Sequence, residues 1–224
     1  MDNRELTAGF AEAGRGHGYT SVQAEFAAFR DFKVRWCRSY KWAEFEVTDY
    51  VRDAPHEVIV GMAETIFQKI DGNEVGYPEA VCDWLTSDAF VDRMQQTYVR
   101  RFPGLGETTV GEHRDLEDSR RRLVEAGLLG KDPRLFIGWV NPSRGKSVGH
   151  ASVLMKVVAM SGLLDREGVS DNLADYCLYS QTAHVSMGFD PEGGRRADEY
   201  EELLDLYPGR ESAEEELEAL GLRI

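Results

Sequence analysis

The fold is decided by the stretch Phe32-Lys-Val-Arg-Trp-Cys-Arg-Ser-Tyr-Lys-Trp-Ala-Glu-Phe-Glu-Val47 and by the segment that follows it. Aromatic and β-branched residues alternate with polar residues through this stretch, which favours a β-hairpin. Asp53-Ala-Pro55 then interrupts the alternation, and apolar residues at helical spacing predict an amphipathic helix over residues 56–70. A hairpin that leads into a core helix predicts an α+β fold.

The second half of the chain has a similar order of expected elements. A short strand is expected over 135–140, and the apolar run 151–160 predicts one strand at the centre of a sheet. Ser170 or Asp171 then caps a helix that reaches His184. Since this order parallels the first half, an internal duplication is one interpretation. The expected organisation is therefore a single domain over 19–224, or two related halves over about 19–110 and 111–224, after a flexible, Gly-rich segment at 1–18.

Further helices are expected over 78–101, over 112–128 and in the acidic tail from Ala197 onward. Large apolar side chains along these elements are expected to be buried: Trp36, Phe45, Ile59, Phe67, Trp84, Trp139, Leu154, Val157 and Tyr176.

The charge balance limits the classes of partner. The chain has 224 residues and a formal net charge of -14, and only 6 of its 26 basic residues are Lys. The overall field repels nucleic acid and anionic membranes, and no apolar run is long enough to span a membrane. An acidic, Lys-poor surface suits a high-salt cytoplasm, so we expect a cytoplasmic protein of halophilic archaeal type, the alternative being a merely acidic protein. Cys37, Cys82 and Cys177 show no C-x-x-C spacing, which predicts free thiols.

The stretch Ser180-Gln-Thr-Ala-His184 has the spacing of the zinc-protease motif H-E-x-x-H with only its last histidine. In that motif, two imidazoles four residues apart bind one ion from the same helix face, and the glutamate activates the bound water. Serine is a poor zinc ligand, and the amide of Gln181 cannot accept a proton at neutral pH. These residues therefore predict neither catalysis nor a bound metal, with His184 as the only candidate ligand.

Segments outside this motif also resemble a known protein family. Over residues 32–220 the chain resembles archaeal SprT-like zinc metalloproteases. The segments that carry the resemblance are Arg35-Trp-Cys-Arg-Ser-Tyr40, Thr48-Asp-Tyr-Val-Arg-Asp-Ala-Pro55, 152–158 and 178–189. The resemblance implies a compact zincin fold in which β-hairpins lead into core helices and one helix carries H-E-x-x-H. It also implies a zinc cofactor and peptide-bond hydrolysis in active members, some of which cleave proteins crosslinked to DNA.

By position, the resemblance assigns the first ligand to Ser180, the base to Gln181, the second ligand to His184 and the third ligand to a position near Arg196. Three of these four residues depart from the family pattern. The resemblance therefore implies a pseudoenzyme without zinc that acts as a protein-binding or scaffold protein, its partner being unidentified.

Two alternative functions remain open. A nucleic-acid-associated module would use the positive charge of Arg100, Arg101 and Arg120–Arg122, joined by Arg35, Arg38 and Lys41 beside Trp36 and Trp42. The same arginines could instead pair with acidic residues on the helix surface. The other alternative is a residual metal-dependent peptidase with an unconventional site near His184.

Overall fold

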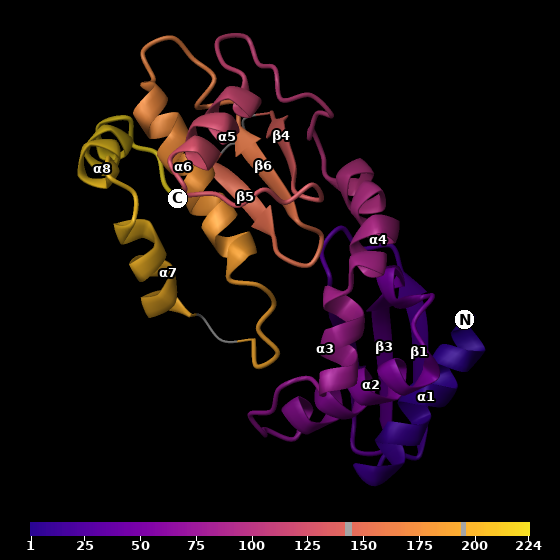
Figure 1. The fold of residues 1–224 in the computed structure, drawn as a ribbon. Coiled ribbons are helices and arrows are strands. Elements are labelled where there is room, and N and C mark those ends of the chain that lie inside the picture. The colour runs from indigo at the N-terminus through magenta and orange to yellow at the C-terminus, as the bar shows by residue number, and fades with distance from the viewer. Residues whose placement is uncertain (142–144, 194–195) are drawn as a thin grey trace. The chain divides into compact units, whose positions relative to one another are not determined.

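The computed structural model describes residues 1–141, 145–193 and 196–224 (Figure 1). The chain divides into two compact units, unit 1 (Met1–Phe90 and Phe189–Gly194) and unit 2 (Val91–Gly188 and Arg195–Ile224). The described residues form eight α-helices and two three-stranded sheets, which confirms the α+β class. The boundary between the units follows Phe90, some twenty residues before the division near 110 that the sequence suggests.

Unit 1 is built around the predicted hairpin. β1 pairs parallel with β3, and β2 pairs antiparallel with β3, so the strand order is β1-β3-β2. The hairpin and the helix over 56–70 are both confirmed. The elements are α1 (Asn3–Gly16), β1 (Ser21–Ala27), β2 (Val34–Arg38), β3 (Trp42–Thr48), α2 (His56–Ile70), α3 (Glu79–Thr86) and the start of α4 (Asp88–Arg101), with a short 3-10 helix, η1 (Asp49–Val51).

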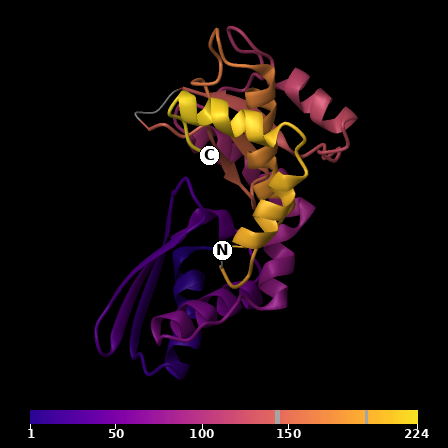
Figure 2. The same cartoon turned by 90° about the vertical axis from the view of Figure 1, so that its left-hand side faces the viewer.

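The sheet of unit 1 has one covered face and one open face. Along β3, Ala43, Phe45 and Val47 are buried, whereas Trp42, Glu44 and Glu46 are exposed. The buried side chains pack against aromatic residues of the helices, since the ring of Phe45 lies 4.8 Å from that of Phe10 in α1 and 5.2 Å from that of Phe67 in α2. Figure 2 shows the helices of this unit on one side of its sheet. The alternation in the sequence is therefore the signature of a sheet that is half in contact with water.

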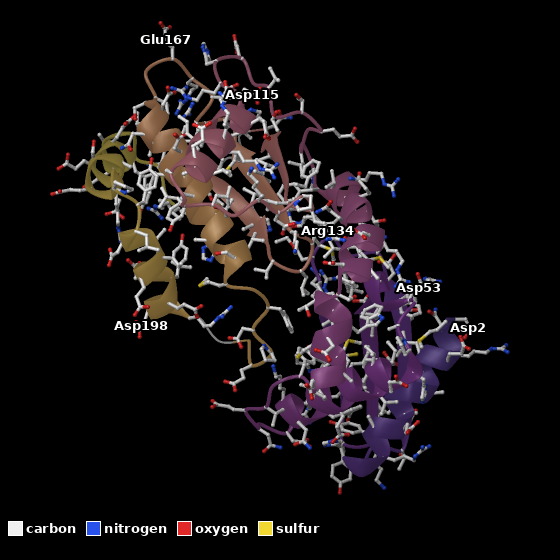
Figure 3. All side chains as sticks on the ribbon, viewed as in Figure 1. Asp2, Asp53, Asp115, Arg134, Glu167 and Asp198 are labelled. Carbon is white, nitrogen blue, oxygen red and sulfur yellow. The ribbon has the colours of Figure 1, made fainter. Side chains whose placement is uncertain are left out.

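The N-terminal segment forms a helix where a flexible segment was expected. Asp2, labelled in Figure 3, caps α1 by accepting hydrogen bonds from the backbone N–H groups of Arg4 and Glu5. Leu6 and Phe10 are completely buried. A Cβ atom added at Gly9 would lie 2.9 Å from Ile59 Cγ2, so a glycine lets α1 approach α2 closely. The glycines that suggested flexibility are required for packing instead.

Unit 2 repeats the strand arrangement of unit 1. β4 pairs parallel with β6 and β5 pairs antiparallel with β6, in the order β4-β6-β5. A helix follows the last strand in both units. The two sheets therefore share the arrangement that an internal duplication requires, and common ancestry of the halves stays a prediction. The elements are α5 (Leu116–Glu125), β4 (Phe136–Val140), β5 (Gly149–Ser152), β6 (Val157–Ser161), α6 (Asp171–Ser186), α7 (Ala197–Asp205) and α8 (Arg210–Ala219).

Two predicted elements are wrong because turns are hidden in them. The expected single strand over 151–160 is the hairpin β5–β6, whose turn contains Lys156 at a φ of 49°. The turn has no Gly or Pro, and β6 is buried at all five residues, so neither turn residues nor alternation marks the boundary. The expected helix over 78–101 is two helices, α3 and α4, separated by Ser87. The hydroxyl of Ser87 accepts a hydrogen bond from Phe90 N and so begins α4.

The predicted core is mostly confirmed. Phe45, Ile59, Phe67, Trp139, Val157 and Tyr176 are buried. Trp84 and Leu154 are only partly buried, and Trp36 is 51% exposed. The prediction for Trp36 is wrong because β2 lies at the edge of its sheet. No helix among the described residues is long and apolar enough to cross a membrane.

His17 joins the end of α1 to α2. Its Nδ1 lies 2.6 Å from Asp71 Oδ2 and its Nε2 lies 2.9 Å from Glu64 Oε1, and its ring stacks on Phe67. Both ring nitrogens face carboxylates, so both donate hydrogen bonds when the ring is protonated. Burial alone would lower the pKa of His17, but the hydrogen bonds to Asp71 and Glu64 outweigh burial and raise it above the ordinary value of 6.5.

We expect this cation to make the stability of unit 1 depend on pH. Because the folded-state pKa of His17 is above its unfolded value, the stabilisation is fully present below about pH 6.5 and is lost as the pH rises through the folded-state pKa. NMR titration of the ring, combined with denaturant unfolding across that interval, measures both quantities. The variant His17→Gln should remove this part of the pH dependence, and an unchanged slope in the variant would contradict the assignment.

Candidate binding surface

The positions that the resemblance assigns to the first zinc ligand and the catalytic base lie in the core of unit 2. Ser180 is completely buried, and its hydroxyl donates a hydrogen bond to Cys177 O one turn earlier in α6. Gln181 is 4% exposed and packs against β5, where a Cβ atom added at Gly149 would lie 3.1 Å from its Cγ. Both residues are therefore buried, Gln181 against β5, and neither is open to a substrate.

His184 and Arg196 hold the end of α6 against α7. The ring of His184 stacks on Tyr200 with centroids 4.0 Å apart, and burial lowers the pKa of His184, which favours the neutral imidazole. Arg196 donates hydrogen bonds to the carbonyl oxygens of Met187 and Gly188, so it caps the C-terminus of α6. Within the described parts of the chain, no group of three or more His, Cys, Asp or Glu side chains is arranged to hold a metal ion.

We expect the restored motif, Ser180→His with Gln181→Glu, to fail as a zinc site. A larger side chain at the buried position 180 should cost roughly 1–3 kcal/mol of stability through overpacking. Calorimetric zinc titration of this variant should detect no tight binding, since only two imidazoles would be present where catalytic zinc takes three protein ligands. His184→Ala is the matched control for the unmodified protein. One zinc per chain that survives dialysis and is lost in His184→Ala would contradict this account.

The three consecutive arginines of α5 have acidic partners. Arg120 donates to Asp132 O and lies 3.6 Å from a Glu117 oxygen, and Arg121 lies 2.7 Å from Asp118. Arg122 makes two hydrogen bonds to the buried Asp175, of 2.6 and 2.7 Å. Arg100 and Arg101 lie in the last turn of α4, where Arg100 donates to Thr97. The contacts of Arg120–Arg122 are those expected for charge pairing on and between helices, which is the simpler of the two interpretations of this cluster.

A different cluster stands out on the β2–β3 hairpin of unit 1. Trp36, Tyr40 and Trp42 are 51%, 88% and 41% exposed, and they are the exposed large aromatic residues of the described chain. The same hairpin carries four cations. We call these seven residues the hairpin surface; they are Lys33, Arg35, Trp36, Arg38, Tyr40, Lys41 and Trp42. Clustered, exposed aromatic residues beside cations mark an interaction site more often than a solvated face.

The cations of the hairpin surface are largely unpaired. Arg35 lies 3.9 Å from Glu46, at the limit of an ion pair. Lys33 and Arg35 both lie over the ring of Phe29, and Arg38 donates to the hydroxyl of Tyr19 at 3.4 Å. Lys33, Arg38 and Lys41 have no carboxylate partner among the described residues. In a chain of net charge -14 this surface is therefore a local positive patch.

β2 is also an open sheet edge. Thr48 N donates to Lys33 O and Ser39 N donates to Trp42 O, which fixes the alternation of the antiparallel ladder. Residues 33, 35, 37 and 39 therefore direct their backbone groups at β3, and Val34, Trp36 and Arg38 direct theirs outward. Over the described parts of the chain, the outward N–H and C=O groups of these three residues have no hydrogen-bond partner.

Each of the other three edge strands receives a hydrogen bond from another segment at or next to its outer side. Thr7 Oγ1 accepts from Ala24 N and donates to Ala24 O, so α1 satisfies the outer edge of β1. In unit 2, Gly106 N donates to Trp139 O on β4. Val148 N, next to β5, donates to Arg223 O of the C-terminal segment. Folds normally protect their edges, and among the described residues β2 is the edge strand with no such hydrogen bond at or next to its outer side.

A groove of about 960 Å³ runs over the open face of the same sheet, between α1 and β2. Glu25, Glu44 and Glu46 line it. Cys37 lies in this groove with its Sγ 3.6 Å from Glu44 Oε2. Desolvation, together with the carboxylates of Glu44 and Glu46, raises the pKa of the Cys37 thiol, which disfavours the reactive thiolate. The groove therefore lacks an activated nucleophile at Cys37.

The sequence places Trp36, Trp42, Arg35, Arg38 and Lys41 beside an arginine cluster, but it does not show that they form a surface of their own. The signal was present in the density of aromatic and basic residues over 33–42. What the sequence could not show is that β2 is the outer strand.

The comparisons with family models, curated proteins and solved structures found no match for this chain.

Proposed function

We propose that this protein is a non-catalytic binding protein and that the hairpin surface is where it binds its partner. The observation that carries the proposal is the coincidence, on one hairpin, of three exposed aromatic side chains, four cations and an unpaired strand edge. Aromatic residues and arginine are the side chains that contribute most to binding energy at interfaces.

The resemblance to SprT-like proteases supports the same proposal in the form of a pseudoenzyme. Ser180 and Gln181 supply neither a ligand nor a base, and both are buried in the core rather than exposed in a cleft. We therefore place binding on the hairpin surface of unit 1 and not at the positions of the degenerate motif. Peptidase activity that requires His184 would overturn the non-catalytic part of this proposal.

The proposal is tested by a photoreactive amino acid placed at Tyr40, with a matched probe at Val110, which is 61% exposed and lies in unit 2. Crosslinking in cells of the source organism should join a specific macromolecule to position 40 and not to position 110. Adding Trp36→Thr should reduce that crosslink without changing the melting temperature, because the Trp36 side chain is half exposed. The same products from both positions would contradict a dedicated hairpin surface.

A further inference from the structure

We infer that the partner bound at the hairpin surface is an acidic, extended peptide segment that adds to the sheet of unit 1 as a fourth strand, along β2. This inference rests on the proposed function and specifies its partner. Strand addition uses main-chain hydrogen bonds for affinity and alternate side chains for specificity. β2 offers both, because its outward backbone groups are unpaired and its side chains are exposed on the two faces of the sheet.

The side chains of β2 define what the added strand carries. Trp36 is directly opposite Phe45 and therefore lies on the helix-covered side of the sheet, together with Arg38. Arg35 is opposite Glu46 and lies on the open side. Cross-strand neighbours interact directly, so an apolar residue beside Trp36 and carboxylates beside Arg35 and Arg38 complement this edge. The chemistry is that of a strand in which acidic residues accompany one central apolar residue.

A second copy of the chain is a poorer occupant of this edge. Pairing β2 with itself would bring the cations Lys33, Arg35 and Arg38 of both copies onto two short adjacent strands. Like charges on neighbouring strands are destabilising. These cations thus act against self-association through an edge that would otherwise invite it.

Single-stranded nucleic acid also fits less well. Trp36 lies on the helix-covered side of the sheet, whereas Trp42 shares the open side with Glu44 and Glu46, so the two indoles do not form one stacking platform. The groove on the open side is lined by Glu25, Glu44 and Glu46 together with Arg4 and Arg35, so it offers a nucleic-acid backbone no continuous run of cations. Nucleic acid would make no regular use of the outward N–H and C=O groups of Val34, Trp36 and Arg38. These groups match the spacing of another peptide strand.

The test uses synthetic capped peptides that are at least as long as β2. The acidic peptide has glutamate at the first and second positions on each side of a central leucine and valine beyond them, and the control peptide has lysine in place of each glutamate. Binding is measured by tryptophan fluorescence and calorimetry with the full chain. We expect the acidic peptide to bind at least about tenfold more tightly than the lysine peptide, and increasing salt to reduce this difference.

Two variants separate the contribution of the backbone hydrogen bonds to peptide affinity from that of the cationic side chains. Val34→Pro removes an outward N–H without removing a hydrogen bond to β3, so the sheet should persist while affinity for the acidic peptide falls about tenfold or more. Arg35→Glu with Arg38→Glu should reverse the preference in favour of the lysine peptide. Circular dichroism and the melting temperature verify that each variant is folded.

Each remaining outcome overturns the inference. A single-stranded oligonucleotide that binds more tightly than the acidic peptide, with no effect of Val34→Pro, would assign the surface to nucleic acid. A dimer detected by light scattering and abolished by Val34→Pro would assign it to a second copy. If neither peptide binds while position 40 still crosslinks specifically, the inference fails and the proposed function stands. If that crosslink is absent as well, both fail.

Discussion

Replacing Phe67 by alanine is expected to lower the free energy of unfolding by about 4 kcal/mol, because a completely buried aromatic ring leaves both lost contacts and a cavity. The ring of Phe67 lies 5.2 Å from that of Phe45 on β3, 5.1 Å from that of Tyr19 and 5.4 Å from that of His17. It therefore connects α2, the sheet and the end of α1. Denaturant unfolding, monitored by tryptophan fluorescence, measures the loss.

The matched control for this prediction is Tyr40→Ala. Tyr40 is 88% exposed at the tip of the hairpin, so its removal should change stability by less than about 0.5 kcal/mol. A loss below about 1 kcal/mol for Phe67→Ala would mean that the core of unit 1 is not organised around this ring.

The second large effect is expected at the pair Arg122–Asp175, which joins α5 to α6. Asp175 is only 7% exposed and receives two hydrogen bonds from Arg122, and the hydrogen bonds to Asp175 raise the pKa of Arg122 despite its partial burial. Arg122→Ala leaves a buried carboxylate without its cation. Since Arg122 itself is partly exposed, we expect a loss of about 3 kcal/mol, at the lower end of the range for broken buried pairs.

Arg121→Ala is the control for Arg122→Ala, because Arg121 pairs with Asp118 at the surface and its loss should cost less than about 1 kcal/mol. Retention on immobilised DNA, measured in parallel, tests the nucleic-acid hypothesis. If the arginines of α5 bind phosphates, both variants weaken retention to a similar degree. If Arg122 is structural, Arg122→Ala lowers stability, and retention of the folded protein is unchanged. Equal and small stability losses for both variants would contradict the assignment of Arg122.

The sequence predicts a helix or strand well where one face of the element is buried and the other is exposed to water. β3 alternates between a covered face and water, so period-2 alternation identified the hairpin, and α2 has buried residues at helical spacing that identified its bounds. β6 is buried on both faces, so it shows no alternation, and the turn before it could not be distinguished from strand. Helix α1 was missed because Gly9 and Gly14, which allow close packing, have the composition of a flexible segment.

The features of the candidate sites were likewise predictable only where local spacing along the chain determines them. The spacing of Ser180 and His184 correctly placed both residues on one helix. It could not reveal that Ser180 faces the core or that Arg196 caps the helix, because both depend on tertiary packing. Trp36 shows the limit most clearly. Alternation predicts which face of a strand a tryptophan occupies, but only strand order determines whether anything covers that face.

The central claim, that the edge of β2 is a binding site for an extended acidic segment, is tested most directly by amide hydrogen exchange residue by residue. In the free protein, the N–H groups of Val34, Trp36 and Arg38 should exchange rapidly while those of Arg35 and Cys37, which face β3, are protected. Adding the acidic peptide should protect the first three. Val34, Trp36 and Arg38 amides that are already protected in the free protein, or that stay unprotected while the peptide is bound, would contradict the claim.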